Sequence, residues 1–139
     1  MSPDRDLIER IYRIALQSRA WAEAEAIATG RDPVTLRDMC VKAAFDLFKR
    51  LQAAGLKPLF AKSRHHAFCL VDGLIVDVTG TQFANCDPVN GVWIADLSDE
   101  DDHGVWTVED QAGSVEEILD LPCWRNWDTC DLPFPVTRR

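Results

Sequence analysis

Three side chains of the 139-residue chain have the types and the order that nucleophilic catalysis needs: Cys40, His66 and Asp77. A cysteine attacks carbonyl carbon as its thiolate, and an adjacent histidine removes the thiol proton. A carboxylate hydrogen-bonded to that imidazole holds the ring in orientation. The chemistry open to such a set is acyl transfer, in which an acyl-enzyme forms on the cysteine and then passes to water or to an amine.

Cys40 belongs to a segment whose apolar residues repeat at helical spacing, from residue 36 to residue 51. The pattern predicts an amphipathic helix with a wide apolar stripe. Thr35 and Asp38 resemble a capping box at its start, and Gly55 marks its end. Cys40 then lies in the first turns, where the helix dipole and the N–H groups of the helix end favour a thiolate. The Asp38 carboxylate would raise the pKa of this thiol unless it serves as a cap.

His66 and Asp77 lie on two β-rich runs, residues 66–71 and 74–79, that flank Asp72-Gly73. This dipeptide between apolar runs is a strong hairpin signal. A two-residue turn makes His66 and Asp77 diagonal neighbours on one face, within reach of a carboxylate–imidazole contact. His65 is the second candidate base, and strand alternation turns it to the opposite face. We expect Cys40 Sγ to lie within about 4 Å of a His66 ring nitrogen.

The remaining pattern predicts one α+β domain over residues 1–139, with N-terminal helices packed on an antiparallel β-sheet. Residues 4–29 carry a helical apolar stripe, and Ser114 caps a short helix that runs to residue 119. We expect the tail from residue 121, which contains Trp124 and Trp127, to lie irregularly over the domain. Further strands are expected at residues 56–61, 92–97 and 105–108.

Composition excludes several classes of partner. The net charge is −8, from 15 basic and 23 acidic residues, and such a surface repels phosphate backbones. We therefore expect no nucleic-acid and no membrane partner. The longest apolar run, residues 67–71, is far shorter than the roughly 20 residues of a membrane span. The charged N-terminus lacks an apolar secretory core, which predicts a cytoplasmic protein.

The five cysteines show no paired spacing, so neither a disulfide framework nor a metal site is predicted. Cys69 lies inside an apolar run and is interpreted as a small buried hydrophobe. A zinc site built from cysteines with His65, His66 or His103 is an alternative. The acidic run at residues 99–104 lacks the twelve-residue loop of a calcium site, and we interpret it as a solvated loop.

Cys40 at the start of an amphipathic helix, His66-Ala67-Phe68 on one strand and Asp77-Val78-Thr79 on the next resemble the transglutaminase-like branch of the papain-like cysteine enzymes. The resemblance covers roughly residues 34–84, and the continuation to Phe83 is similar to small bacterial or phage proteins of this superfamily. It implies a papain-like single domain, a Cys40–His66–Asp77 triad and no cofactor. Asp38-Met39 stands where a Trp or Gly commonly precedes the family's cysteine.

These observations predict a cysteine-dependent enzyme that cleaves or modifies a peptide or side-chain amide, as a protease, deamidase or transglutaminase. Cys40 attacks the carbonyl, His66 transfers the proton and Asp77 holds the ring. Gln82 is a candidate oxyanion donor beside the Cys40 N–H, and it could equally close a loop by hydrogen bonds. The expected partner is a peptide or protein amide. The alternative is a catalytically inactive binding or assembly module on the same fold.

Overall fold

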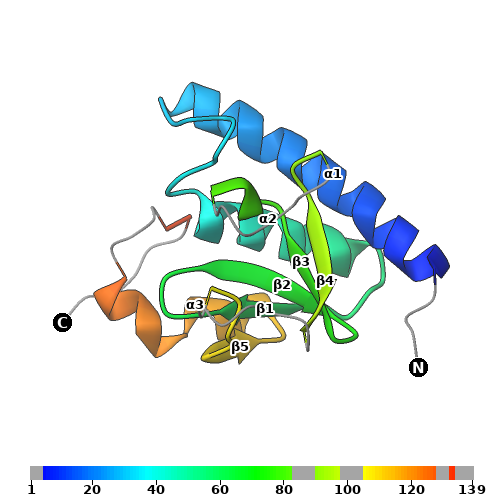
Figure 1. Ribbon diagram of the computed structural model, residues 1–139. Coiled ribbons are helices and arrows are strands. Elements are labelled where there is room, and N and C mark those ends of the chain that lie inside the picture. The colour runs from blue at the N-terminus through cyan, green and yellow to red at the C-terminus, as the bar shows by residue number, and fades with distance from the viewer. Residues whose placement is uncertain (1–4, 83–89, 98–104, 128–131, 134–139) are drawn as a thin grey trace.

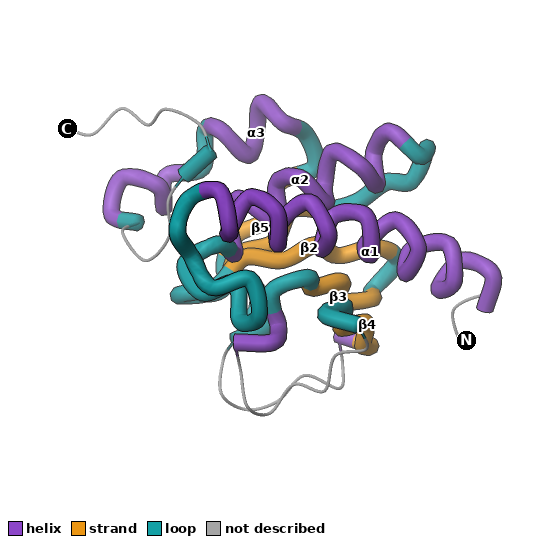
Figure 2. The backbone as a smooth tube through the Cα atoms, turned by 90° about the horizontal axis from the view of Figure 1, so that it is seen from above, coloured by secondary structure: helices purple, strands orange, loops and turns teal. Residues whose placement is uncertain are grey.

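Two helices, α1 (Arg5–Ala28) and α2 (Cys40–Ala53), pack against each other over one face of an antiparallel sheet (Figures 1 and 2). The computed structural model describes residues 5–82, 90–97, 105–127 and 132–133. The α+β class and the order of its parts are as the sequence predicts. α2 lies directly on the sheet because its apolar stripe, from Cys40 to Leu51, is buried. None of the described helices has the length and apolar character that crossing a membrane requires.

The start of α2 differs from the prediction. The helix begins at Cys40, not at residue 36, because Leu36 and Asp38 have φ angles of 53° and 67°. This left-handed region cannot continue a right-handed helix. The predicted capping box is also wrong, since Thr35 Oγ1 donates to Asp32 Oδ2 at 3.0 Å and the N-cap position has no side-chain cap bond. Cys40 is therefore the first residue of the helix and lies at the positive end of its dipole.

Over the described part of the chain, the sheet has five strands in the order β4-β3-β2-β1-β5, and every neighbouring pair is antiparallel. Val71 pairs with Leu74, which is the register that a two-residue turn requires. Asp72 and Gly73 have φ angles of 50° and 79°, the conformation of a type I′ hairpin turn. The strands are β1 (Leu59–Lys62), β2 (Ala67–Val71), β3 (Leu74–Asp77), β4 (Trp93–Asp96) and β5 (Asp110–Ala112).

The strand predicted at residues 105–108 is wrong, because the last strand, β5, begins at Asp110. Residues 105–108 instead pass over the sheet face that α2 does not cover. There Trp106 is buried with a small apolar cluster of sheet residues: Ala61, Phe68, Leu70 and Ile75. The central strand β2 is buried along its whole length, since its alternate residues pack into the cores on the two faces.

The C-terminal part closes the core at the β1–β5 edge of the sheet. Ser114 caps α3 (Val115–Leu119) as predicted, accepting a hydrogen bond from the Glu117 N–H at 3.2 Å. A 3₁₀ helix, Pro122–Asn126, follows. The indole of Trp124 is buried edge-on against Phe60, with ring centroids 5.9 Å apart, and donates to the Ile118 carbonyl at 2.6 Å. The tail is thus part of the fold.

The hairpin turn gives a direct test of the β2–β3 register. Gly73→Ala places a Cβ on a residue at φ +79° that has no atom within 4 Å of it, so any loss of stability is backbone strain. We expect the free energy of unfolding in urea to fall by about 1 kcal/mol. Gly113→Ala, where the new Cβ makes an ordinary 3.6 Å contact with Leu59, is the control and should change it by less than about 0.5 kcal/mol. Equal losses at both positions would contradict the turn assignment.

Candidate active site

The predicted contact between His66 and Asp77 is present. His66 precedes β2 and Asp77 ends β3, and His66 Nε2 lies 2.7 Å from Asp77 Oδ2. The two side chains are only 2% and 1% exposed. The imidazole also stacks on Phe68, two residues along the chain, with ring centroids 6.0 Å apart. The hairpin register alone brings these two groups together, as the sequence indicates.

Asp77 receives hydrogen bonds on both carboxylate oxygens. Oδ1 accepts from the Thr79 N–H at 2.8 Å and from Thr79 Oγ1 at 3.2 Å. Oδ2, which meets His66, also accepts from Trp106 Nε1 at 2.8 Å. Sequence reasoning missed Trp106, because nothing local marks an indole 29 residues further along the chain as a partner of this carboxylate. Thr79 is the threonine of the Asp-x-Thr motif, so the sequence motif already indicated a threonine close to Asp77.

Trp106 also encloses the pair. Its ring lies edge-on to the His66 imidazole, with centroids 6.3 Å apart, and packs on Trp93 at 4.2 Å. Trp106 itself is 1% exposed. The indole therefore gives Asp77 a donor and keeps water away from the carboxylate–imidazole contact. Trp93, half-buried on β4, supports this indole.

Asp77 is ionised in the folded protein. Burial by itself raises the pKa of this carboxyl, but the His66 imidazole and the donors of Thr79 and Trp106 outweigh that effect and hold the pKa below its usual value. An ionised carboxylate only accepts hydrogen bonds, so the proton in the 2.7 Å contact belongs to His66 Nε2. When the ring is neutral, its basic nitrogen is then Nδ1, which is also buried.

Cys40 lies at the N-terminal end of α2 and is 3% exposed. It packs in the core on the helix-covered face of the sheet, together with Ala67 and Cys69 of β2. Cys69 Sγ donates to the Ala44 carbonyl at 3.3 Å, one helical turn along from Cys40. Asp38 is exposed, so its carboxylate is in solvent near the helix end. His66 contacts rings of the opposite cluster, and its approach to Cys40 stays a prediction.

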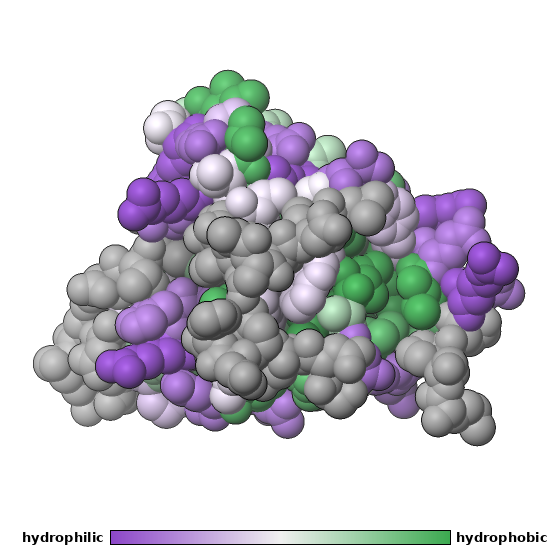
Figure 3. Space-filling model, in the orientation of Figure 1, coloured by the Kyte–Doolittle hydropathy of each residue, from purple (hydrophilic) through white to green (hydrophobic). Residues whose placement is uncertain are grey.

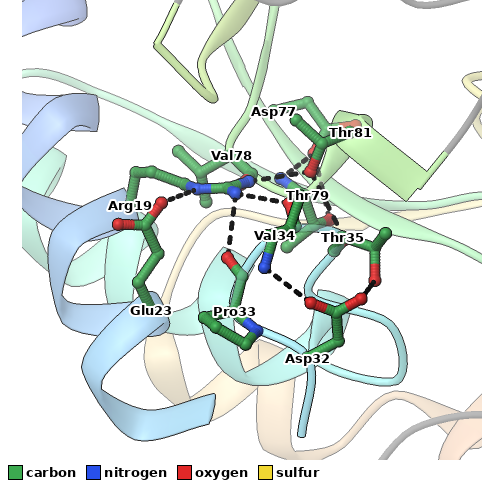
Figure 4. A network of polar contacts seen from close by, with 10 residues as sticks. All are labelled: Arg19, Glu23, Asp32, Pro33, Val34, Thr35, Asp77, Val78, Thr79 and Thr81. Carbon is green, nitrogen blue, oxygen red and sulfur yellow. Dashed lines mark hydrogen bonds and ion pairs between the residues drawn. The ribbon is translucent and has the colours of Figure 1, made fainter. Parts of the chain in front are cut away.

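Two links place the start of α2 at the Asp77 end of the hairpin, away from the Asp72-Gly73 turn. Thr81 Oγ1 donates to the Thr35 carbonyl at 3.3 Å. The buried guanidinium of Arg19 donates to the carbonyls of Val78 at 2.9 Å and Val34 at 2.7 Å (Figure 4). The chain before Cys40 is thus fastened to the chain after Asp77. This arrangement puts all three predicted residues at one end of the sheet.

The other candidates fall outside this arrangement. His65 is exposed, so it is not the ring that meets Asp77. Gln82 ends a 3₁₀ helix, Gly80–Gln82, and its side chain lies outside the described part of the chain. His103 and the acidic run 99–104 also lie outside it, as do two of the five cysteines, Cys86 and Cys130. Within the residues that the structure describes, no group of three or more His, Cys, Asp or Glu side chains is placed to hold a metal ion.

The remaining described cysteines are poor nucleophiles. Burial, and then the Asp77 and Asp46 carboxylates, raise the pKa of the Cys69 thiol well above its usual value. Cys69 is thus the buried hydrophobe that the sequence predicts. Burial is also the main cause that raises the pKa of the Cys123 thiol to about 11. Neither thiol is ionised near neutral pH.

A separate hollow lies on the surface between α1 and β4. It has a volume of about 720 Å³. The space-filling view shows apolar residues gathered in this part of the surface (Figure 3). Its lining residues are Arg5, Ile8, Glu9, Tyr12, Val92 and Ile94. Cys40, His66 and Asp77 are not among them, so the hollow is separate from the candidate site.

Comparison of the chain with protein-family models, with curated proteins and with solved structures finds no match. The interpretation of the site therefore depends on its own geometry.

The Asp77 pKa predicts how stability depends on pH. Because the folded pKa lies below the unfolded value of about 4, the ionised carboxylate stabilises the fold at neutral pH, and this contribution is lost as pH falls through the folded pKa. Asp77→Asn should lower the free energy of unfolding by about 2–4 kcal/mol at pH 7. The difference in the free energy of unfolding between wild type and Asp77→Asn, measured by urea titration, should decrease steadily below about pH 4.

Asp72→Asn, at the exposed turn of the same hairpin, is the matched control. It keeps a residue type that tolerates the φ of 50°, and we expect a change of less than about 0.5 kcal/mol across the same pH series. A gap between wild type and Asp77→Asn that stays constant from neutral to acid pH would show that Asp77 is not a stabilising anion.

Proposed function

We propose that this protein is a papain-like, transglutaminase-like cysteine enzyme that transfers the acyl group of a peptide or side-chain amide. The observation that carries the proposal is the buried 2.7 Å contact between His66 Nε2 and the ionised Asp77. It fixes one imidazole nitrogen and directs the base function to the other. The N-terminal end of α2, where Cys40 lies, is fastened to the same end of the hairpin. Nucleophile, base and orienting carboxylate are the three parts that this chemistry needs.

In the proposed reaction, His66 Nδ1 takes the proton of Cys40 Sγ, and the thiolate attacks the amide carbonyl carbon. The backbone N–H of Cys40 and the Gln82 amide are the proposed donors to the oxyanion. His66 returns the proton to the leaving nitrogen as the C–N bond breaks, which leaves a thioester on Cys40. Water or an amine then attacks the thioester, with His66 as base, and the thiol is regenerated. Asp77 stays ionised throughout and holds the ring.

The position of Cys40 supports its role as the nucleophile. As the first residue of a helix of 14 residues, it lies where the dipole lowers the pKa of a thiol. Cys69 belongs to β2, and its Sγ donates to the Ala44 carbonyl in the same core. Burial, and then the Asp77 and Asp46 carboxylates, raise the pKa of its thiol. Of these two cysteines, Cys40 is the one at the first position of a helix, and this supports it as the proposed nucleophile.

A second candidate is a binding or assembly module without chemistry, and the burial of the site favours it. Cys40, His66 and Asp77 are 3%, 2% and 1% exposed, so a substrate reaches them only after a local opening. A buried Asp–His pair can also serve stability alone. The reactivity of Cys40 separates the two candidates, because only the enzyme needs an activated thiolate.

We therefore predict that Cys40 reacts with iodoacetamide at a pH well below the pKa of a free thiol, about 8.5. His66→Ala should move this profile to higher pH, because it removes the base that accepts the thiol proton. Cys69 and Cys123 should stay unlabelled near neutral pH, since both pKa values are raised. Mass spectrometry of each cysteine-containing peptide across a pH series measures all three.

His65→Ala is the matched control, because it removes an exposed imidazole adjacent to His66 and should leave the Cys40 profile unchanged. Labelling of Cys40 no earlier than Cys123, or equal shifts with His65→Ala and His66→Ala, would contradict the enzyme proposal. The binding-module candidate would then stand.

A further inference from the structure

Arg19, on the sheet-facing side of α1, is a buried arginine whose hydrogen bonds connect the two halves of the candidate site. It is 5% exposed, and five acceptors surround its guanidinium, as many as the group has N–H donors. Figure 4 shows the guanidinium between two separate segments of chain. The contacts are Nε to Glu23 Oε2 at 2.9 Å, Nη1 to the Val78 carbonyl and Thr81 Oγ1 at 2.9 Å each, and Nη2 to the carbonyls of Pro33 at 3.2 Å and Val34 at 2.7 Å.

Four of these five acceptors belong to the segment that leads into α2 or to the segment that follows Asp77. Nη2 bonds residues 33 and 34, which lead into α2, and Nη1 bonds residues 78 and 81, which lead out of β3. Thr81 Oγ1 also donates to the Thr35 carbonyl at 3.3 Å. Because a guanidinium is planar and rigid, it fixes the two segments relative to each other in distance and in direction.

Two neighbouring residues, Asp32 and Gly91, help to keep the Arg19 guanidinium in place. Asp32 accepts from the Val34 N–H at 2.8 Å and from Thr35 Oγ1 at 3.0 Å, which sets the turn whose carbonyls face Arg19. These bonds lower the pKa of the Asp32 carboxyl. Gly91 has φ +82°, and a Cβ there would lie 2.6 Å from Arg19 Nε. A residue with a side chain would therefore displace the guanidinium.

Stability alone does not account for a buried cation at this position. Among the residues that the structure describes, its anionic partner is Glu23, whose side chain is 46% exposed, and the other four acceptors are neutral. Removing an arginine from water is unfavourable, and apolar side chains of similar volume often stabilise a fold as well or better. What only a guanidinium provides is a fixed set of five directed donors.

We propose that Arg19 is a positioning residue of the active site: it holds the Cys40-bearing end of α2 against the strand end that carries Asp77, and so sets the approach of Cys40 Sγ to His66 Nδ1. This inference rests on the proposed cysteine chemistry. Arg19 bonds residues 23, 33, 34, 78 and 81, so it acts on the site through the segments that flank Cys40 and Asp77. Its loss should alter the reactivity of Cys40 and leave the His66–Asp77 contact in place.

The test compares the iodoacetamide pH profile of Cys40 in wild type and Arg19→Lys, with the His66 Nε2–H proton observed by NMR in both. Lysine keeps the charge but has three donors in a different geometry, so the fork is lost. We expect the Cys40 profile to move up by about one pH unit, roughly a tenfold slower rate near pH 6.5. The His66 Nε2–H signal should stay at its wild-type position.

Thr81→Val and Arg50→Lys complete the test. Thr81→Val removes one Arg19 acceptor and the hydrogen bond to Thr35, so it should shift the Cys40 pH profile in the same direction by a smaller amount. If Arg19→Lys shows no cooperative unfolding in urea and is therefore not folded, the profile of Thr81→Val is the test. Arg50→Lys makes the same replacement on α2, where Arg50 pairs with Asp46, and should leave the profile unchanged.

The outcomes separate the two proposals. If wild-type Cys40 shows no early reactivity, the proposed function fails and this inference fails with it. If wild type shows it and neither Arg19→Lys nor Thr81→Val shifts it, the inference alone is overturned. It is also overturned if the His66 Nε2–H signal changes together with the profile, or if Arg50→Lys shifts the profile equally, because Arg19 would then act only through general stability.

Discussion

The buried carboxylate of Asp77 is the constraint around which this end of the molecule is organised. An ionised group that is 1% exposed has lost its hydration and must be surrounded by donors. Those donors come from three places along the chain: His66 before β2, Thr79 two residues after Asp77, and Trp106 on the way to β5. Satisfying one anion thus joins the hairpin, the turn that follows it and the segment that covers the outer face of the sheet.

The residues 77–81 connect this anion to a second buried charge. Asp77 accepts from the outer-face cluster, while the carbonyl of Val78 and the hydroxyl of Thr81 accept from the Arg19 guanidinium on the helix side. The segment 77–81 therefore contains a buried anion, Asp77, on the outer face of the sheet, and it contacts a buried cation, Arg19, on the helix side. Buried charges of this kind contribute little net stability. Each must stay close to its hydrogen-bond partners, because a displaced partner leaves the charge unsatisfied.

The start of α2 is the third component. Leu36 and Asp38 adopt left-handed φ angles, and Leu36 is fully buried, so core packing holds a backbone conformation that local preference disfavours. The result is a helix that begins at Cys40. A thiol at the first position of a helix gains the most from the dipole, whereas one turn further along it gains little. The backbone strain and the proposed reactivity of Cys40 thus have one structural origin.

The sequence by itself determined what depends on neighbours along the chain. Asp72-Gly73 between two β-rich runs set the hairpin register, and the register placed His66 against Asp77. Helical periodicity located α1, and Ser114 located α3, because caps and apolar stripes act within a few residues. These features could be predicted because the interactions that specify them are local.

Tertiary structure alone decided the rest. Propensity favoured a strand at residues 105–108, but pairing with β1 selected Asp110–Ala112, and Trp106 was placed on Asp77 from 29 residues away. The sequence predicted a capping box at Thr35 and Asp38. In the structure, Arg19 and Thr81 instead bond the carbonyls of Val34 and Thr35, and the helix begins at Cys40. The physical reason is the same in each case. A buried charge must be hydrogen-bonded by groups that are close in space, and these groups can be far apart in the sequence, so local sequence patterns do not indicate them.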